Sequence, residues 1–194
     1  MPAEPLQILM HISKILDSLG ISYLTGGSIA SSIYGVPRAT QDIDLVIDLP
    51  PGKVQDFAKA LQSDFYIDTD AVIRAVETGS SFNAIHFETV QKIDFFIRGK
   101  DEYAAEEMRR RLKIAIDESG RQTVFIASPE DVILQKLLWF KMGSGTSERQ
   151  WRDTLGVIKV QSASLDREYL ARWAKALDIA ELVQKAFLDA TRNG

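Results

Sequence analysis

Residues 41–48 read QDIDLVID and alternate between apolar and acidic positions over most of their length. Side chains two residues apart in a strand point to the same face, so this spacing predicts a β-strand with two unlike faces. The apolar face would carry Ile43, Leu45 and Ile47, and the acidic face Asp42, Asp44 and Asp48. Carboxylates held that close together repel one another unless a counter-charge is present. The stretch therefore predicts a strand whose acidic face binds a cation.

A hard divalent cation suits this strand best. The chain has no cysteine and only two histidines, which excludes thiolate zinc sites and leaves too few ligands for a histidine-built centre. Mg²⁺ or Mn²⁺ prefers carboxylate oxygens together with substrate phosphates. A third acid, Asp94, stands between Ile93 and Phe95 in a predicted strand at residues 92–97, where an unpaired carboxylate would be costly. We expect Asp42, Asp44 and Asp94 to bind the metal.

A glycine turn precedes the acidic strand. Gly26, Gly27 and Ser28 follow a predicted strand at residues 22–25 and open a short predicted helix at residues 28–34. Turn, helix and acid–apolar–acid strand together resemble the signature of the nucleotidyltransferase superfamily, whose palm is polymerase-β-like. Asp94 is similar to the third acid of that superfamily. The resemblance implies an α/β (α+β) palm and a metal-dependent reaction on a nucleoside triphosphate.

Further residues resemble one branch of the superfamily. Arg38 and Thr40, just before the acidic strand, look like the version found in AbiEii-type toxin nucleotidyltransferases and minimal bacterial relatives. The later helical residues Asp131, Lys136, Arg149, Arg152 and Asp153 are similar to motifs of that group. The resemblance covers about residues 23–153. It also implies a possible antitoxin partner.

The resemblance assigns roles to these residues. Gly26, Gly27 and Ser28 would cradle the triphosphate, which agrees with the preference of helix-start amides for anions. Asp42, Asp44 and Asp94 would be catalytic metal ligands, with Asp94 also helping to deprotonate the acceptor. The expected nucleotide contacts comprise Arg38, Thr40, Arg149 and Arg152. The reaction would move a nucleoside monophosphate from ATP or another triphosphate to a hydroxyl of tRNA, a protein or a small molecule.

Lys136 has an unusual predicted environment. Its neighbours three and four residues away on a helix are Val132, Ile133, Trp139 and Phe140. A lysine avoids such surroundings unless its ammonium has an anionic partner or extends to solvent. We expect it to act in catalysis by reaching the nucleotide phosphates or the acceptor, and a solvent-extended lysine is the alternative. Arg38 is explained equally well as a loop arginine or as a phosphate contact.

The chain divides into two predicted parts. Residues 1–127 would form the nucleotidyltransferase palm, a mixed sheet flanked by helices. Residues 128–194 would form a helical part packed on it, with the nucleotide in the cleft between them. Ser128, Pro129 and Asp131 mark the start of this part, because they form a helix-start signature. At Asp131 capping is therefore favoured over catalysis.

Composition limits the alternatives. The chain has 194 residues, 45% of them hydrophobic and 26% charged, as in folded globular proteins. No apolar run approaches the roughly 20 residues of a membrane helix, so a cytoplasmic protein is expected. The net charge of −4 argues against a nucleic-acid-coating protein. The basic run at residues 109–113 could meet RNA, although a solvated edge explains it as well. The rival function is a catalytically inactive, nucleotide-binding relative that acts as a toxin–antitoxin or RNA-binding partner module.

Overall fold

The computed structural model describes residues 4–40, 42–117 and 120–192. The chain divides into two compact units. Unit 1 comprises Met1–Gly26 and Thr40–Ile126, and unit 2 comprises Gly27–Ala39 and Ala127–Gly194. The later crossing between the units therefore lies close to Ser128. The segment 27–39, which the sequence alone assigned to the palm, groups with the carboxy-terminal helices.

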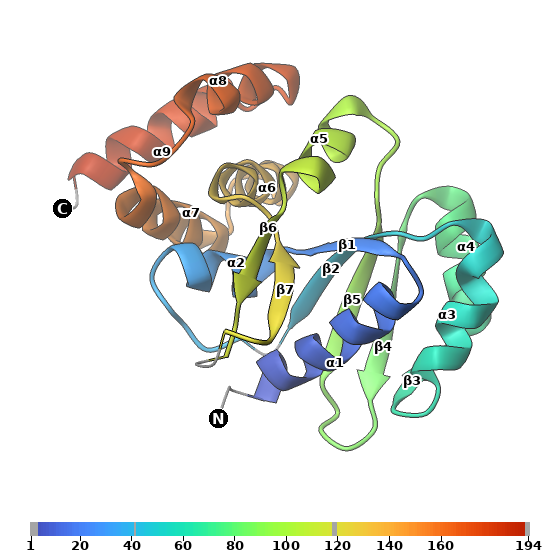
Figure 1. Cartoon of the computed structure of the whole chain (residues 1–194). Coiled ribbons are helices and arrows are strands. Elements are labelled where there is room, and N and C mark those ends of the chain that lie inside the picture. The colour runs from blue at the N-terminus through green and yellow to red at the C-terminus, as the bar shows by residue number, and fades with distance from the viewer. Residues whose placement is uncertain (1–3, 41, 118–119, 193–194) are drawn as a thin grey trace. The chain divides into compact units, whose positions relative to one another are not determined.

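Unit 1 contains a seven-stranded mixed sheet in the order β3-β4-β5-β2-β1-β7-β6 (Figure 1). Its strands are β1 (Ser22–Thr25), β2 (Ile43–Asp48), β3 (Phe65–Ile67), β4 (Ser81–His86), β5 (Lys92–Ile97), β6 (Leu112–Ala115) and β7 (Thr123–Ile126). The β2–β5 and β1–β7 pairs are parallel, and the other neighbours are antiparallel. The predicted α/β architecture with a mixed sheet is confirmed. Gln41, the first residue of the predicted acidic strand, lies outside the described residues.

The apolar face of the sheet forms the core of unit 1. Ile43, Leu45 and Ile47 of β2 are fully buried, as their alternation predicted. The helices of the unit are α1 (Glu4–Ser18), η1 (Pro51–Lys53), α3 (Val54–Leu61), α4 (Thr69–Thr78) and α5 (Glu102–Arg110). Phe57 of α3 meets Phe95 of β5 edge-on at 5.5 Å between ring centroids, so α3 packs on this face. The opposite face is consequently the one left for chemistry.

Unit 2 is helical. It contains α2 (Gly27–Tyr34), α6 (Pro129–Met142), α7 (Glu148–Gln161), α8 (Arg167–Ala176) and α9 (Ala180–Arg192), and α2 contacts both α6 and α7. Gly35 permits this packing, because a Cβ there would lie 2.8 Å from the Val157 backbone nitrogen. In the described residues, no helix combines the length and apolar character required to span a bilayer.

The start of α6 is fixed by buried polar contacts. The Ser128 hydroxyl accepts from the Asp131 backbone N–H at 3.2 Å, and it donates to the Asp131 carboxylate at 2.6 Å. Tyr169 of α8 donates its hydroxyl to the other oxygen of the same carboxylate at 2.6 Å. Asp131 is fully buried. Its contacts therefore support the capping role over a catalytic one.

Candidate functional site

Asp44 and Asp94 lie side by side on the half-exposed face of the sheet in unit 1. They are register partners in the parallel strands β2 and β5, and neighbouring strands are about 4.7–4.9 Å apart. Both residues are half-buried, whereas the residues on either side of them in their strands are buried. Asp42 is exposed and directly precedes β2. Two acids that are fifty positions apart in the sequence are thus neighbours in the fold.

Lys92 supplies a positive charge to this acidic face. Its ammonium nitrogen lies 2.9 Å from Asp94 Oδ2. The pKa of Lys92 is raised, chiefly by the hydrogen bond to Asp94 and further by the negative charges of Asp94, Asp42 and Asp44. All three carboxylates are therefore within electrostatic reach of one ammonium group. The sequence reasoning overlooked Lys92, although its position two residues before Asp94 on one strand placed both on the same face.

The residues of this face suit a divalent metal that shares its ligands with a substrate. Within the described ranges, no three metal-ligating side chains form a ready-made metal site. The donors that the face does offer are carboxylate oxygens. Mg²⁺ is commonly bound by one or two carboxylates, with substrate phosphates and water as the other ligands. Asp44 and Asp94, with Asp42 beside them, fit that pattern.

The glycine turn begins where β1 ends. Gly26 donates its backbone N–H to the Asp44 carbonyl oxygen at 3.0 Å, so this amide is already used in holding β2. Gly27 has a φ of +57°, a left-handed conformation that favours glycine. It opens α2, and Ser28 follows half-buried. The phosphate cradle expected at this turn would thus depend on Gly27 and Ser28 and not on the Gly26 amide.

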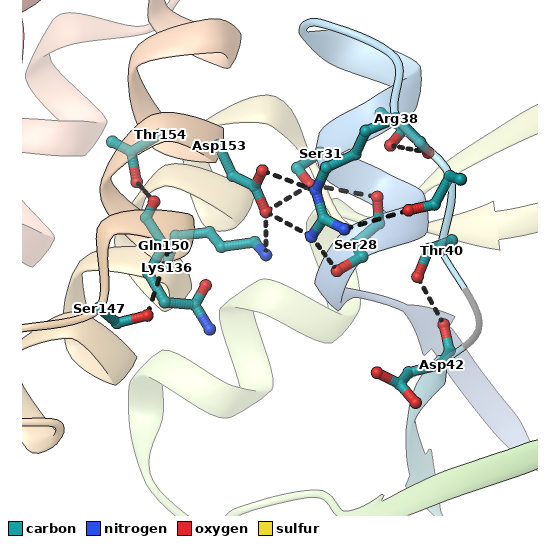
Figure 2. Close-up of polar contacts among 12 residues, drawn as sticks. Ser28, Ser31, Arg38, Thr40, Asp42, Lys136, Ser147, Gln150, Asp153 and Thr154 are labelled. Carbon is teal, nitrogen blue, oxygen red and sulfur yellow. Dashed lines mark hydrogen bonds and ion pairs between the residues drawn. The ribbon is translucent and has the colours of Figure 1, made fainter.

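A second polar cluster lies within unit 2, around Asp153 of α7 (Figure 2). Arg38 donates to its carboxylate from Nε at 3.0 Å and from Nη2 at 2.9 Å. Lys136 of α6 donates to the same carboxylate at 2.7 Å. The side chains of Lys136 and Asp153 are only 5% and 7% exposed. Lys136 therefore has the anionic partner that its apolar neighbours required, and its expected contact with nucleotide stays a prediction.

Two smaller contacts complete this Asp153 cluster. Arg38 Nη2 also donates to the Ser28 hydroxyl, and Ser31 donates to Asp153 at 3.4 Å. Arg38 thereby links the start of α2 to α7 inside unit 2. Burial acts to raise the pKa of Asp153, but the hydrogen bonds from Arg38 and Lys136 outweigh it, and the net pKa is lowered. Asp153 is consequently a carboxylate at neutral pH.

Three further candidates are Thr40, Arg149 and Arg152. Thr40 belongs to unit 1 and donates its hydroxyl to the Asp42 carbonyl at 3.3 Å (Figure 2). Arg149 and Arg152 are exposed on α7, and Arg152 lies 3.8 Å from Glu148. Asp48, which the sequence reasoning left out of the site, is 3.1 Å from Arg98 Nε at the end of β2.

Comparison with known proteins places the fold. No family model and no curated sequence matches the chain. Among solved structures, an antigenic nucleotidyltransferase-like protein from Paracoccidioides brasiliensis is 18% identical, with 96% of this chain and 94% of that one covered and a TM-score of 0.57. The antibiotic-resistance factor ANT(2″)-Ia is 17% identical over 100% and 99%, with a TM-score of 0.59. The lincosamide antibiotic adenylyltransferase LnuA, solved with lincomycin, is 13% identical over 78% and 95%, with a TM-score of 0.52. The chain thus shares the nucleotidyltransferase fold.

Proposed function

We propose that this chain is a metal-dependent nucleotidyltransferase that moves a nucleoside monophosphate from a triphosphate to an acceptor hydroxyl and releases pyrophosphate. One observation carries the proposal: in a chain that shares the nucleotidyltransferase fold, Asp44 and Asp94 are register partners on the half-exposed face of the sheet. Asp42 directly precedes the first of these strands. Carboxylates held this close repel one another, so they destabilise a fold in which no cation offsets their charge.

The three acids would hold Mg²⁺ or Mn²⁺. When bound, the metal offsets the charge of the phosphates and of the departing pyrophosphate. The acceptor oxygen forms a bond to the α-phosphorus as the bond from that phosphorus to pyrophosphate breaks. Asp94 would take the proton of the acceptor hydroxyl, a role typically worth about 10²- to 10⁴-fold in rate. Gly27 and Ser28 would bind phosphate oxygens.

Metal-dependent nucleotide binding tests the proposal first. Calorimetry with each triphosphate, in Mg²⁺ and in chelator, should show binding only with the metal, because the carboxylates alone repel a triphosphate. Transfer should then be assayed with α-labelled triphosphate and total cellular RNA, protein or small-molecule acceptors. Equal affinity in chelator would remove the metal from the mechanism.

A matched pair of variants tests the assignment of the acids. Asp44→Asn should reduce transfer by about 10³-fold or more, on the scale of losing an essential catalytic group. Asp48→Asn is the control, since Asp48 shares the strand and the acidic face but pairs with Arg98 at the strand end. It should retain transfer within a few-fold. If both variants transfer equally well, Asp44 is not a metal ligand.

A further inference from the structure

The direction from which an acceptor approaches follows from the strand order, given the proposed function. In nucleotidyl transfer the attacking and leaving oxygens lie on opposite sides of the reacting phosphorus. The glycine turn begins at Gly26, which directly follows β1 and donates its backbone N–H to the Asp44 carbonyl oxygen. A triphosphate held at this turn would therefore lie on the β1 side of β2. Its leaving pyrophosphate lies on that side too. The acceptor must then approach from the other side, across β5, β4 and β3.

The register identifies the side chains on that route. Asn83 of β4 is directly opposite Asp94, and Ile85 is directly opposite Lys92. Tyr66 of β3 is directly opposite Ile85. Directly opposed residues of antiparallel strands point to the same face, so all of them share the face of the acids. Tyr66 is 61% exposed and the Lys92 side chain 48% exposed. We call Tyr66, Asn83, Ile85 and Lys92 the acceptor platform.

The chemistry of this platform is selective. Neither β3 nor β4 contains an aspartate or glutamate. The platform therefore offers an ammonium group, an amide, an aromatic ring and the apolar side chain of Ile85. With the metal on Asp42, Asp44 and Asp94, a polycationic acceptor such as an aminoglycoside would meet Lys92 and would find no further carboxylate on β3 or β4. A planar ring can stack on Tyr66, and an anionic group can meet Lys92, whose side chain is half-exposed and whose ammonium lies 2.9 Å from Asp94 Oδ2.

The spacing permits one ligand to make both contacts. Tyr66 and Lys92 lie on strands separated by β4, which is about 10 Å between strand axes. Ile85 lies between them in the register, and Asn83, two residues away on β4 and opposite Asp94, can donate and accept hydrogen bonds. One small acceptor that carries a planar ring, an anionic group and a hydroxyl would thus contact Tyr66 and Lys92 while its hydroxyl faces Asp94.

We infer that Tyr66 and Lys92 determine acceptor specificity, and that they select a hydroxyl-bearing acceptor with a planar ring and a nearby anionic group over a polycation. This inference rests on the proposed nucleotidyl transfer. A ring with an adjacent phosphate occurs both at the end of an RNA strand and in a free nucleoside monophosphate. The test therefore includes both sources.

The experiment compares acceptors and variants in one assay. Labelled triphosphate and Mg²⁺ are supplied with a short RNA, adenosine monophosphate or tobramycin. Anisotropy of a fluorescent RNA measures binding independently of turnover. Transfer to RNA or to the monophosphate is expected, and transfer to tobramycin is not. Transfer to tobramycin alone, or binding of neither the RNA nor the monophosphate, would overturn the inference.

The variants separate the two contacts. Tyr66→Ala should raise the acceptor KM about tenfold or more, on the scale of a lost base–aromatic stack. Tyr66→Phe should keep the wild-type KM, because it keeps the aromatic ring. Lys92→Gln should weaken binding of the anionic probe and flatten its salt dependence. Lys59→Gln, on α3 across the sheet, is the control and should change neither. Unchanged acceptor binding in both Tyr66→Ala and Lys92→Gln would also overturn the inference.

Failure of this inference can be told apart from failure of the proposed function. Metal-dependent triphosphate binding is measured without any acceptor, in wild type and in Tyr66→Ala. If that binding is absent in wild type, the proposed function itself fails. If it is intact while the platform variants bind acceptors normally, only the acceptor assignment is wrong.

Discussion

The acidic face of unit 1 and the Asp153 cluster of unit 2 differ in charge and in exposure. In unit 1, Asp44 and Asp94 lie on a half-exposed face, and both carboxylates help to raise the pKa of Lys92. In unit 2, Arg38 and Lys136 both donate to one carboxylate, Asp153, whose side chain is almost fully buried. The first group is rich in carboxylates and open to water. The second is rich in cations and largely buried, with the Arg38 side chain 28% exposed.

This difference predicts how each group responds to the loss of a charge. Half-exposed carboxylates remain hydrated, so neutralising one relieves repulsion and costs the fold little. A buried carboxylate that pairs with a buried ammonium, as Asp153 does with Lys136, cannot be neutralised without leaving a charge unpaired in a medium of low polarity. Chemistry is therefore expected of the open group, whereas the Asp153 cluster joins α2, α6 and α7 within unit 2.

Asp153→Asn should produce the largest change in stability. It leaves the buried Lys136 ammonium without its carboxylate, and breaking a buried pair in this way typically costs about 3–5 kcal/mol. The free energy of unfolding, measured in urea, is the readout. Asp178→Asn is the control, because Asp178 pairs with Lys141 but its side chain is 95% exposed. Equal stability of the two variants would show that the Asp153 cluster contributes nothing to the fold.

The same variant gives this prediction a dependence on pH. The folded-state pKa of Asp153 is lowered, so its contribution to stability is present above the unfolded-state pKa, about 3.9, and is lost as pH falls through the folded value. The stability difference between wild type and Asp153→Asn should accordingly shrink below about pH 4. A difference that stays constant from pH 7 to pH 3 would contradict the pairing.

Lys136→Met should have an intermediate effect. The substitution keeps the apolar stem and removes the charge, while Asp153 retains Arg38 as a partner. The loss of stability should therefore be smaller than in Asp153→Asn. If Lys136 also serves the nucleotide, kcat/KM should fall at least tenfold, about 1.4 kcal/mol. Wild-type turnover in a folded Lys136→Met protein would leave Lys136 with a structural role only.

Asp42→Asn and Asp44→Asn should have the smallest effect on stability. In chelator each removes repulsion on the acidic face, so unfolding free energies should be unchanged or raised by up to about 1 kcal/mol. Thermal melting in chelator checks this. A fall of many degrees in both variants would make these acids structural and would erase the contrast with Asp153.

Local patterns predicted the strands around the site well. The strands β1 and β5 have the predicted bounds. In β5 the buried residues Ile93 and Phe95 alternate with residues that are exposed or half-buried, whereas three consecutive residues of β1 are buried. The register that pairs Asp44 with Asp94 could not be predicted, since it depends on contacts made across the intervening chain. The same holds for Asp153 as the partner of Lys136: apolar neighbours on one helix showed that an anion was needed, but not which helix would supply it.

The backbone of the glycine turn shows another limit of sequence patterns. Two adjacent glycines indicated amides open to phosphate, yet the Gly26 amide bonds to Asp44. A motif identifies residue types, and only the fold decides which of their donors are already used. The grouping of residues 27–39 with the carboxy-terminal helices was equally inaccessible, because no change in composition marks it.

The parallel pairing of β2 with β5 links ligand binding to folding. Parallel neighbours cannot be joined by a tight turn, and here everything from Leu49 to Gln91 intervenes, including β3 and β4. Asp44 and Asp94 become neighbours only after that whole segment has closed. A cation that needs both acids would bind the unfolded chain far more weakly. At a concentration of 100 Kd, binding to the native state alone adds about 2.7 kcal/mol to its stability. Thermal unfolding of unit 1 should then report the occupancy of the acidic face, without any acceptor or turnover.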